Sequence, residues 1–447
     1  MSFISHTPEE RASMLAKIGI ASGSMEELFR SIPPELRAKS FNLPDGRSEL
    51  EVENYLLSLA RRNTANLVYF LGGGFYDHFI PAAVDALASR SEFYTSYTPY
   101  QPEASQGTLQ ALYEFQSCIC RLLSLEAANA SLYDGGTALY EAAMMAIRIT
   151  DRNKIVMDGG VNPIYRKMLY SYTSNLSVEF VEIPVTHGNS SRDDIENVLD
   201  DRTAAVITQN PNFFGTLDNH ADIAEHCHEH GALLIQSVYP MALGLTAAPG
   251  EIGADIAVGE GQSLGLPLSF GGPFLGFMAA RKQYVRKMPG RIAGATTDAK
   301  GRKGYVLTLQ AREQHIRREK AMSNICTNQS LCALRALIFM SLYGKQGLTE
   351  AAGLCRDKAE YAKSRLRAVP GVEVYDETPT FNEFMVRLPK DPAGIIGKLI
   401  DKGIAGGFPL GRYYPEYRDW MLVAVTEKRT KQEIGLFAER LEEVLAG

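Results

Sequence analysis

Residues 249–273 read PGEIGADIAVGEGQSLGLPLSFGGP, and this stretch is the strongest indication of the fold. Within it, Asp255–Gly259 is a short, nearly continuous apolar run. Such a run is typical of a strand whose two faces are both buried, as in a parallel sheet covered by helices. The stretch therefore predicts a central strand that leads directly into a glycine-rich segment.

Similar apolar runs lie on both sides of this strand, and helical patterns separate the earlier ones. Alternation of strands and helices requires crossover connections, which favour a parallel sheet with helices on both faces. The further predicted strands are Lys154–Asp158, Val178–Val185, Thr203–Gln209, Ala232–Val238 and Phe274–Ala280, and the predicted helices between them are 162–174, 191–199 and 220–230.

The ends of the chain differ from this central part. Apolar spacing of three and four residues predicts helices over 7–18, 24–30, 48–62 and 106–124, and later over 327–344 and 346–368. A smaller α+β pattern follows, with strands 372–376, 381–389 and 420–426 and helices 391–402 and 430–445. We therefore predict a helical arm and loop region over 1–105, a large α/β domain over 106–325 and a small α+β domain over 326–447. Residues 289–304 are expected to form a solvated surface loop.

Composition limits the class of protein. The 447 residues carry 46 Lys and Arg against 52 Asp and Glu, a formal charge of −6. This charge argues against a polybasic nucleic-acid or membrane-surface protein, and no apolar run is long enough to span a membrane. The first residues do not resemble a secretory signal, and the six cysteines lack CxxC pairing, so we expect a cytosolic chain with reduced thiols.

Several short motifs have both a chemical and a structural interpretation. Asp134–Thr137 precedes a strong helix and offers backbone N–H groups to an anion, although a capping turn explains it equally well. The glycine cluster Leu71–His78 matches no nucleotide fingerprint.

His226 and His230 share a helix face, yet a structural role near a helix end is favoured and no metal site is predicted. The charged run Arg312–Lys320 is read as a solvated helix face that can also dock an acidic partner.

Residues Tyr97–Glu103 read YTPYQPE, in which two prolines fix an extended backbone. Such a rigid segment displays its polar and aromatic side chains at defined positions, which suits a substrate or partner surface as well as a stiff connector. The side chains displayed are those of Thr98, Tyr100, Gln101 and Glu103.

In pyridoxal-phosphate (PLP) enzymes of the aspartate aminotransferase fold, a strand like Asp255–Gly259 leads to a lysine that forms a Schiff base with the cofactor. Counting five residues back from Pro267 places that position on Gln262, and a one-residue gap would place it on Ser263. Neither side chain forms an imine. Ser237 stands where that fold carries the Asp that holds the pyridinium nitrogen. Two requirements of PLP catalysis are therefore missing.

The chain resembles, over essentially its whole length, the α subunits of the P-protein family of the glycine cleavage system. The most specific stretches are Tyr94–Gln110, Asn129–Ala138, Pro249–Pro273 and Arg312–Gln329. The resemblance implies fold type I of the PLP-dependent transferases, with a mostly parallel seven-stranded sheet and a smaller C-terminal domain. It also implies that the partner β subunit carries the cofactor lysine, which fits Gln262 and Ser237 in this chain.

The activity implied by the resemblance is the decarboxylation of glycine. PLP on the β subunit takes part in the loss of CO2, and the aminomethyl group passes to the lipoyl arm of the H protein. The family suggests an α2β2 assembly. Our own hypothesis is that Thr98, Tyr100, Gln101 and Glu103 are interface contributors, which supply polar groups to the β site or to the channel for the lipoyl arm. The alternatives are a purely structural scaffold subunit and an autonomous PLP enzyme whose lysine lies elsewhere.

Overall fold

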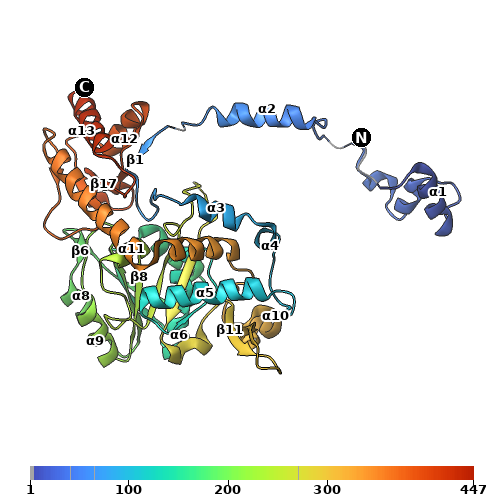
Figure 1. The fold of residues 1–447 in the computed structure, drawn as a ribbon, viewed down its shortest axis with the longest axis horizontal. Coiled ribbons are helices and arrows are strands. Elements are labelled where there is room, and N and C mark those ends of the chain that lie inside the picture. The colour runs from blue at the N-terminus through green and yellow to red at the C-terminus, as the bar shows by residue number, and fades with distance from the viewer. Residues whose placement is uncertain (1–4, 41, 65, 270) are drawn as a thin grey trace. The chain divides into compact units, whose positions relative to one another are not determined.

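The computed structural model describes residues 5–40, 42–64, 66–269 and 271–447 and divides the chain into two units, Met1–Ala65 and Asn66–Gly447 (Figure 1). Across the described residues, no helix has the length and apolar character required to cross a membrane.

The first unit contains two α-helices, α1 (Pro8–Lys17) and α2 (Glu49–Ala60). Ser48 starts α2 with a capping box, in which its hydroxyl accepts the N–H of Glu51 and the Glu51 carboxylate accepts the N–H of Ser48. The helix predicted over 24–30 is a 3-10 helix, Met25–Phe29. Within the first unit, the contacts of α2 leave none of its side chains buried.

The second unit is built around a seven-stranded sheet with the order β2-β10-β9-β8-β7-β3-β4. The strands from β9 to β4 are parallel to their neighbours, while β10 is antiparallel to both β9 and β2. This confirms the predicted mostly parallel sheet. The strands are β2 (Ala127–Ala128), β3 (Lys154–Asp158), β4 (Glu179–Ile183), β7 (Thr203–Asn210), β8 (Leu233–Val238), β9 (Ile256–Glu260) and β10 (Gly276–Ala280).

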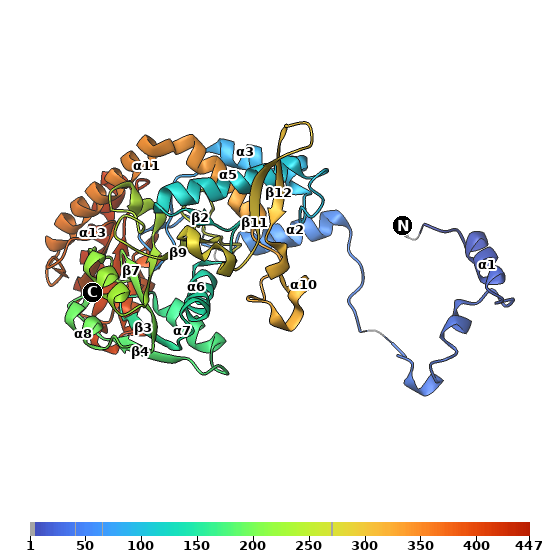
Figure 2. The same ribbon diagram turned by 90° about the horizontal axis from the view of Figure 1, so that it is seen from below.

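Helices cover both faces of this sheet (Figure 2). Alternate residues of β3 show why: Ile155 and Met157 pack in the cluster that contains α6, whereas Val156 packs with the residues of α8 and α9. A further core joins α5 and α11 to the β9–β10 end of the sheet. These helices are α5 (Gln106–Leu123), α6 (Gly135–Thr150), α7 (Pro163–Tyr172), α8 (Arg192–Asn197), α9 (Ala221–Glu229) and α11 (Ser330–Arg367).

The C-terminal part carries its own four-stranded sheet, ordered β13-β14-β17-β16. Gly344 interrupts α11 with a φ of 58°, which agrees with the two helices predicted on either side of this position. β1 pairs in parallel with β15 and so ties the start of the second unit to its end. The elements are β1 (Val68–Tyr69), β13 (Glu373–Val374), β14 (Glu383–Arg387), β15 (Ile404–Ala405), β16 (Phe408–Pro409), β17 (Trp420–Ala424), α12 (Pro392–Asp401) and α13 (Lys431–Ala446).

The prediction of a surface loop over 289–304 is wrong. This segment contains β11 (Ile292–Thr297), which pairs antiparallel with β12 (Lys303–Thr308). Ala293 and Leu307 are buried against α5 in a small core of their own, so packing overrides the Gly, Thr and Lys content that suggested a loop. The predicted domain boundaries after residues 105 and 325 stay predictions.

Short elements complete the second unit. They are α3 (Ala82–Ala88), α4 (Ser91–Tyr94), α10 (Gln314–Arg317), β5 (Val185–Thr186) and β6 (Asn189–Ser190).

Candidate functional site

The turn after β9 places Gln262 in the interior of the second unit, where its side chain is only 2 % exposed. Its amide oxygen accepts the N–H of Tyr76 at 2.9 Å. Its amide nitrogen donates to the carbonyls of Tyr76 at 3.2 Å and Leu266 at 2.8 Å. The side chain at the predicted lysine position therefore binds the glycine-rich segment 71–78, which comes from a distant part of the chain.

The Glu260 carboxylate lies at the N-terminus of α6. One of its oxygens accepts the N–H of Gly135 at 2.9 Å, and the other accepts the N–H groups of Gln262 at 2.9 Å and Leu275 at 3.0 Å. The Asp134 side chain caps the same helix by accepting the N–H of Thr137 at 2.7 Å. An internal carboxylate thus occupies a backbone amide that a helix N-terminus would otherwise offer to a bound anion.

Tyr76 joins Gln262 to Glu383 of β14. Its hydroxyl donates to Oε2 of Glu383 at 2.7 Å, and Oε1 of Glu383 accepts the N–H of Gly73 at 2.7 Å. A Cβ on Gly72 would lie 1.9 Å from the same Oε1, so the approach of the backbone to this carboxylate requires glycine. The Tyr76 ring packs against the Tyr239 ring with centroids 4.3 Å apart. The segment 71–78 is therefore held inside the unit by both its backbone and its aromatic side chain.

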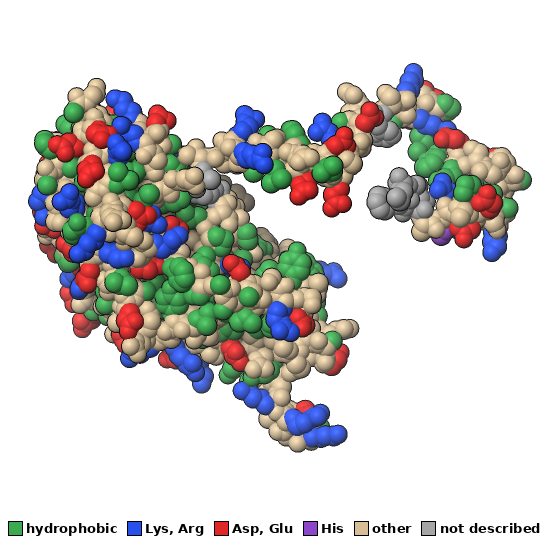
Figure 3. Space-filling view, turned by 45° about the horizontal axis from the view of Figure 1, so that its top comes forward, with side chains coloured by type: hydrophobic (Ala, Val, Ile, Leu, Met, Phe, Trp, Pro, Cys, Tyr) green, Lys and Arg blue, Asp and Glu red, His purple; other side chains and the backbone are tan. Residues whose placement is uncertain are grey.

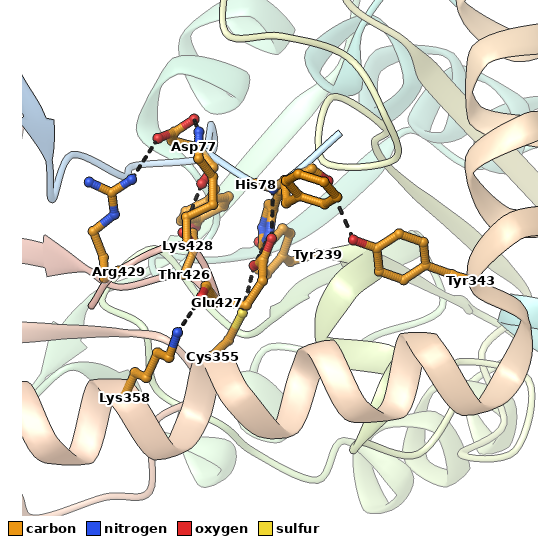
Figure 4. A network of polar contacts seen from close by, with 12 residues as sticks. Asp77, His78, Tyr239, Tyr343, Cys355, Lys358, Thr426, Glu427, Lys428 and Arg429 are labelled. Carbon is orange, nitrogen blue, oxygen red and sulfur yellow. Dashed lines mark hydrogen bonds and ion pairs between the residues drawn. The ribbon is translucent and has the colours of Figure 1, made fainter. Parts of the chain in front are cut away.

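The end of the segment is fixed by a second network (Figure 4). Nδ1 of His78 lies 2.6 Å from Oε2 of Glu427, and its other ring nitrogen contacts the Tyr239 hydroxyl. Oε1 of Glu427 accepts the N–H of Phe79 at 2.7 Å, and the thiol of Cys355 lies 3.3 Å from Oε2. These contacts join the segment to α11 and to the residues after β17.

His78, Cys355 and Glu427 are also the group within the described residues whose donor atoms all lie within 4.8 Å of one another. Two ligands of a tetrahedral zinc ion, each at about 2.0–2.1 Å from the metal, lie roughly 3.3 Å apart. The 2.6 Å separation of Nδ1 and Oε2 is instead a charge-assisted hydrogen bond. The three residues therefore form a structural hydrogen-bond network that holds the end of segment 71–78.

Burial controls the protonation of this interior. It raises the pKa of Glu260 to about 7 against the three N–H bonds that lower it, and it raises the pKa of Glu383 to about 7 against the bonds from Tyr76 and Gly73. Burial also raises the pKa of Glu427, but the hydrogen bond and charge of His78 outweigh it and set that pKa at about 2. The Glu427 carboxylate is thus ionised over the physiological pH range.

These residues do not fit PLP. The cofactor requires an amine for its covalent bond, whereas Gln262 presents an amide that already makes three hydrogen bonds. It also requires donors for a phosphate, whereas the amide of Gly135 at the start of α6 already donates to the Glu260 side chain. Tyr76 is also buried here, with only 7 % of its surface exposed, and its backbone bonds the Gln262 amide. We call this buried and hydrogen-bonded group of Gln262, Glu260 and Tyr76 the filled pocket.

The predicted interface contributors lie elsewhere. Tyr100 is 43 % exposed, and its hydroxyl accepts a hydrogen bond from Arg291 at 2.7 Å. Thr98 is half-buried, and its carbonyl accepts the N–H of Tyr100 at 2.9 Å, whereas Gln101 and Glu103 are exposed. In the described part of the chain, no hydrogen bond joins these residues to Gln262. Ser237 is buried within β8.

Six residues of the site were not predicted: Tyr76, His78, Glu260, Cys355, Glu383 and Glu427. The glycine cluster 71–78 was the available signal, because consecutive glycines permit close backbone approach. Its partner Glu383 lies 310 residues from Gly73 along the chain, so no local pattern connects them.

The fold is also found in solved structures. A glycine decarboxylase (P-protein) of the glycine cleavage system, in inhibitor-bound form, superposes with a TM-score of 0.93 at 43 % identity, with all of both chains covered. A NifS-like protein superposes with a TM-score of 0.64 at 14 % identity over 85 % of this chain and 99 % of its own. The seven-stranded sheet with its covering helices is the fold of the fold-type I PLP-dependent enzymes.

Sequence comparison identifies the family within this class. The family model described as glycine cleavage system P-protein matches residues 1–441. A probable glycine dehydrogenase (decarboxylating) subunit 1 from Citrifermentans bemidjiense is 58 % identical over 445 residues, with all of both chains covered. Its counterpart from Maridesulfovibrio salexigens is 56 % identical over 441 residues, with 99 % of each chain covered. The chain belongs to the glycine cleavage system P-protein family.

Proposed function

We propose that this chain is the α subunit, subunit 1, of a glycine decarboxylase of the glycine cleavage system. With a separate β subunit it decarboxylates glycine, releases CO2 and transfers the aminomethyl group to the lipoyl arm of the H protein. The observation that carries this proposal is the filled pocket around Gln262, Glu260 and Tyr76. PLP, which supplies an electron sink for the loss of CO2, is then held by the partner.

An exposed apolar face supports an obligate partner (Figure 3). Leu87 of α3, Tyr94 of α4 and Leu331 of α11 are exposed by 39–68 %, and Tyr97 is exposed by 77 %. A small groove between α4, α5 and α11 is lined mainly by apolar side chains, among them Leu334. Large contiguous apolar surfaces on a folded chain mark protein interfaces, and the β subunit is the occupant we assign to this one.

The first unit supports the same conclusion independently. Within α2, Leu50, Tyr55, Leu56 and Leu57 are 46–66 % exposed, although the helix is well capped and carries no buried residue. Isolated amphipathic helices of this length gain little stability by themselves. A partner that covers this face explains why the sequence keeps these apolar side chains.

Within this assembly, we assign the segment Thr98–Glu103 to the active site of the β subunit. Its backbone is fixed by two prolines and its side chains include exposed polar groups. Closing a site with a second subunit excludes water from the reacting groups, which strengthens electrostatic interactions inside it.

The six free cysteines agree with the reducing cytosol as the location of this enzyme.

A scaffold role without contact to the β site is the second candidate, because Gln101 and Glu103 make no hydrogen bond through their side chains among the described residues. Tyr100→Phe and Glu103→Gln in the assembled enzyme separate the two. Slower glycine decarboxylation with intact assembly supports a contribution to the site, and an unchanged rate supports the scaffold.

The direct test is co-expression with a β subunit that carries the cofactor lysine, followed by the glycine–bicarbonate exchange assay. Each subunit is assayed alone and then in the mixture. We expect exchange in the mixture only. Exchange catalysed by this chain alone would make it an autonomous enzyme and would contradict the proposal.

A further inference from the structure

Arg291 is a buried arginine outside the filled pocket, and only 3 % of its surface is exposed. It lies just before β11, and its carbonyl accepts the N–H of Ala130 at 2.8 Å, so its backbone is anchored beside β2. Its Nη2 donates to the Tyr100 hydroxyl at 2.7 Å, and its guanidinium carbon lies 5.1 Å from the centre of the Tyr100 ring. One buried cation therefore binds both the hydroxyl and the ring.

Two further side chains complete the surroundings of Tyr100. Oε2 of Glu313 lies 3.6 Å from Nε of Arg291 and 3.6 Å from Nδ1 of His315. The His315 ring in turn contacts the Tyr100 ring edge-on, with centroids 5.6 Å apart. Tyr100, Arg291, Glu313 and His315 thus form a closed cycle. This gives part of the charged run Arg312–Lys320 a specific contact, beyond that of a solvated helix face.

The chemistry of the Arg291 bond sets the direction of the Tyr100 hydroxyl. A guanidinium has donors and no acceptor, so the Tyr100 oxygen must accept this bond. Its own hydrogen is then directed to another acceptor. Arg291 reaches the hydroxyl from the buried side, whereas Tyr100 itself is 43 % exposed. A donor bond from a cation also polarises the hydroxyl, which makes it a stronger donor toward its next partner.

We propose that Arg291 is a positioning residue, which holds the Tyr100 hydroxyl so that it donates to an acceptor oxygen in the active site of the β subunit. This inference rests on the proposed function, because it requires that Tyr100 reaches that site. Arg291 acts through Tyr100 and touches no reacting group. The Glu313 carboxylate, 3.6 Å from Nε, provides a nearby opposite charge for the guanidinium, and the His315 ring packs edge-on against the Tyr100 ring.

The test is a double-mutant cycle in the reconstituted α/β enzyme with PLP, using Arg291→Met, Tyr100→Phe and the double variant. We expect each single variant to lower kcat/KM of glycine–bicarbonate exchange by roughly tenfold to a hundredfold, since small displacements of positioning groups cost that much. The double variant should lie within about twofold of Tyr100→Phe, because Arg291 acts through that side chain. Arg152→Met removes two arginine hydrogen bonds to backbone carbonyls elsewhere and should leave kcat/KM unchanged.

Four results are informative. Losses that multiply in the double variant would overturn the inference, as would a loss in Arg291→Met with normal Tyr100→Phe. An impaired Tyr100→Phe beside a normal Arg291→Met would overturn the inference and leave the proposed function standing. Normal activity in both single variants would overturn the contribution of the segment to the β site as well. If Arg291→Met does not assemble, Arg291→Lys replaces it in the cycle, with the same non-additivity expected.

Discussion

Gln262→Lys restores the amine at the position where fold-type I enzymes carry it, and it tests whether the pocket is truly filled. The substitution removes the acceptor of the Tyr76 N–H and breaks the two bonds that the amide nitrogen donates to Tyr76 and Leu266. An unsatisfied buried donor costs about 1–3 kcal/mol, and a buried ammonium adds several more unless it is neutralised. The free energy of unfolding should therefore fall by roughly 3–5 kcal/mol.

The assay has two readouts on the purified chain. Urea unfolding measures the loss of stability, and absorbance after addition of PLP measures cofactor binding. We expect a destabilised chain that does not bind PLP, because Tyr76 and Glu260 still occupy the pocket. Gln432→Lys makes the same chemical change on the exposed surface of α13 and should leave stability within about 0.5 kcal/mol. If the Gln262→Lys chain binds PLP stoichiometrically at wild-type stability, the side chains around position 262 do not exclude the cofactor.

Two further perturbations address the same interior. Burial raises the pKa of Glu383 in the folded chain to about 7, above its ordinary value near 4.5. Between these two pH values the folded chain therefore binds more protons than the unfolded chain. Its free energy of unfolding falls as the pH rises from 4.5 to 7. Glu383→Gln should remove roughly 2–4 kcal/mol of this fall, measured by urea unfolding at pH 5 and pH 8, and an unchanged pH dependence would be inconsistent with a raised pKa. Gly135→Ala places a Cβ 2.6 Å from the Tyr165 hydroxyl and should destabilise the chain by about 1–3 kcal/mol in the same assay. Gly107→Ala is the control, because its Cβ meets no atom within 4 Å, and it should not destabilise the chain. Equal stability of the two variants would contradict the close packing at α6.

The elements that the sequence predicted well are those whose signal is local. The apolar run of β9 lies beside its own turn, so the strand and the amide at Gln262 follow from a few consecutive residues. Gly344 likewise marks the break in α11 because only its own backbone conformation is involved. Patterns of this kind require no knowledge of distant contacts.

The remainder of the site depends on contacts between distant segments. Glu427 binds Phe79 across 348 residues, and Glu383 binds Tyr76 across 307 residues. Neither carboxylate differs in its local sequence from an ordinary surface residue. The β11–β12 hairpin was missed for a related reason, since the packing of Leu307 against α5 outweighs a composition that favours a loop.

If this chain works through a partner that holds the cofactor, PLP in the active α/β complex lies on the β subunit. Its location can be measured by fixing the cofactor with borohydride, separating the two chains and weighing each by mass spectrometry. We expect the added mass of the reduced cofactor on a lysine of the β subunit and an unmodified α chain. The same mass on the chain described by this structure would contradict this expectation.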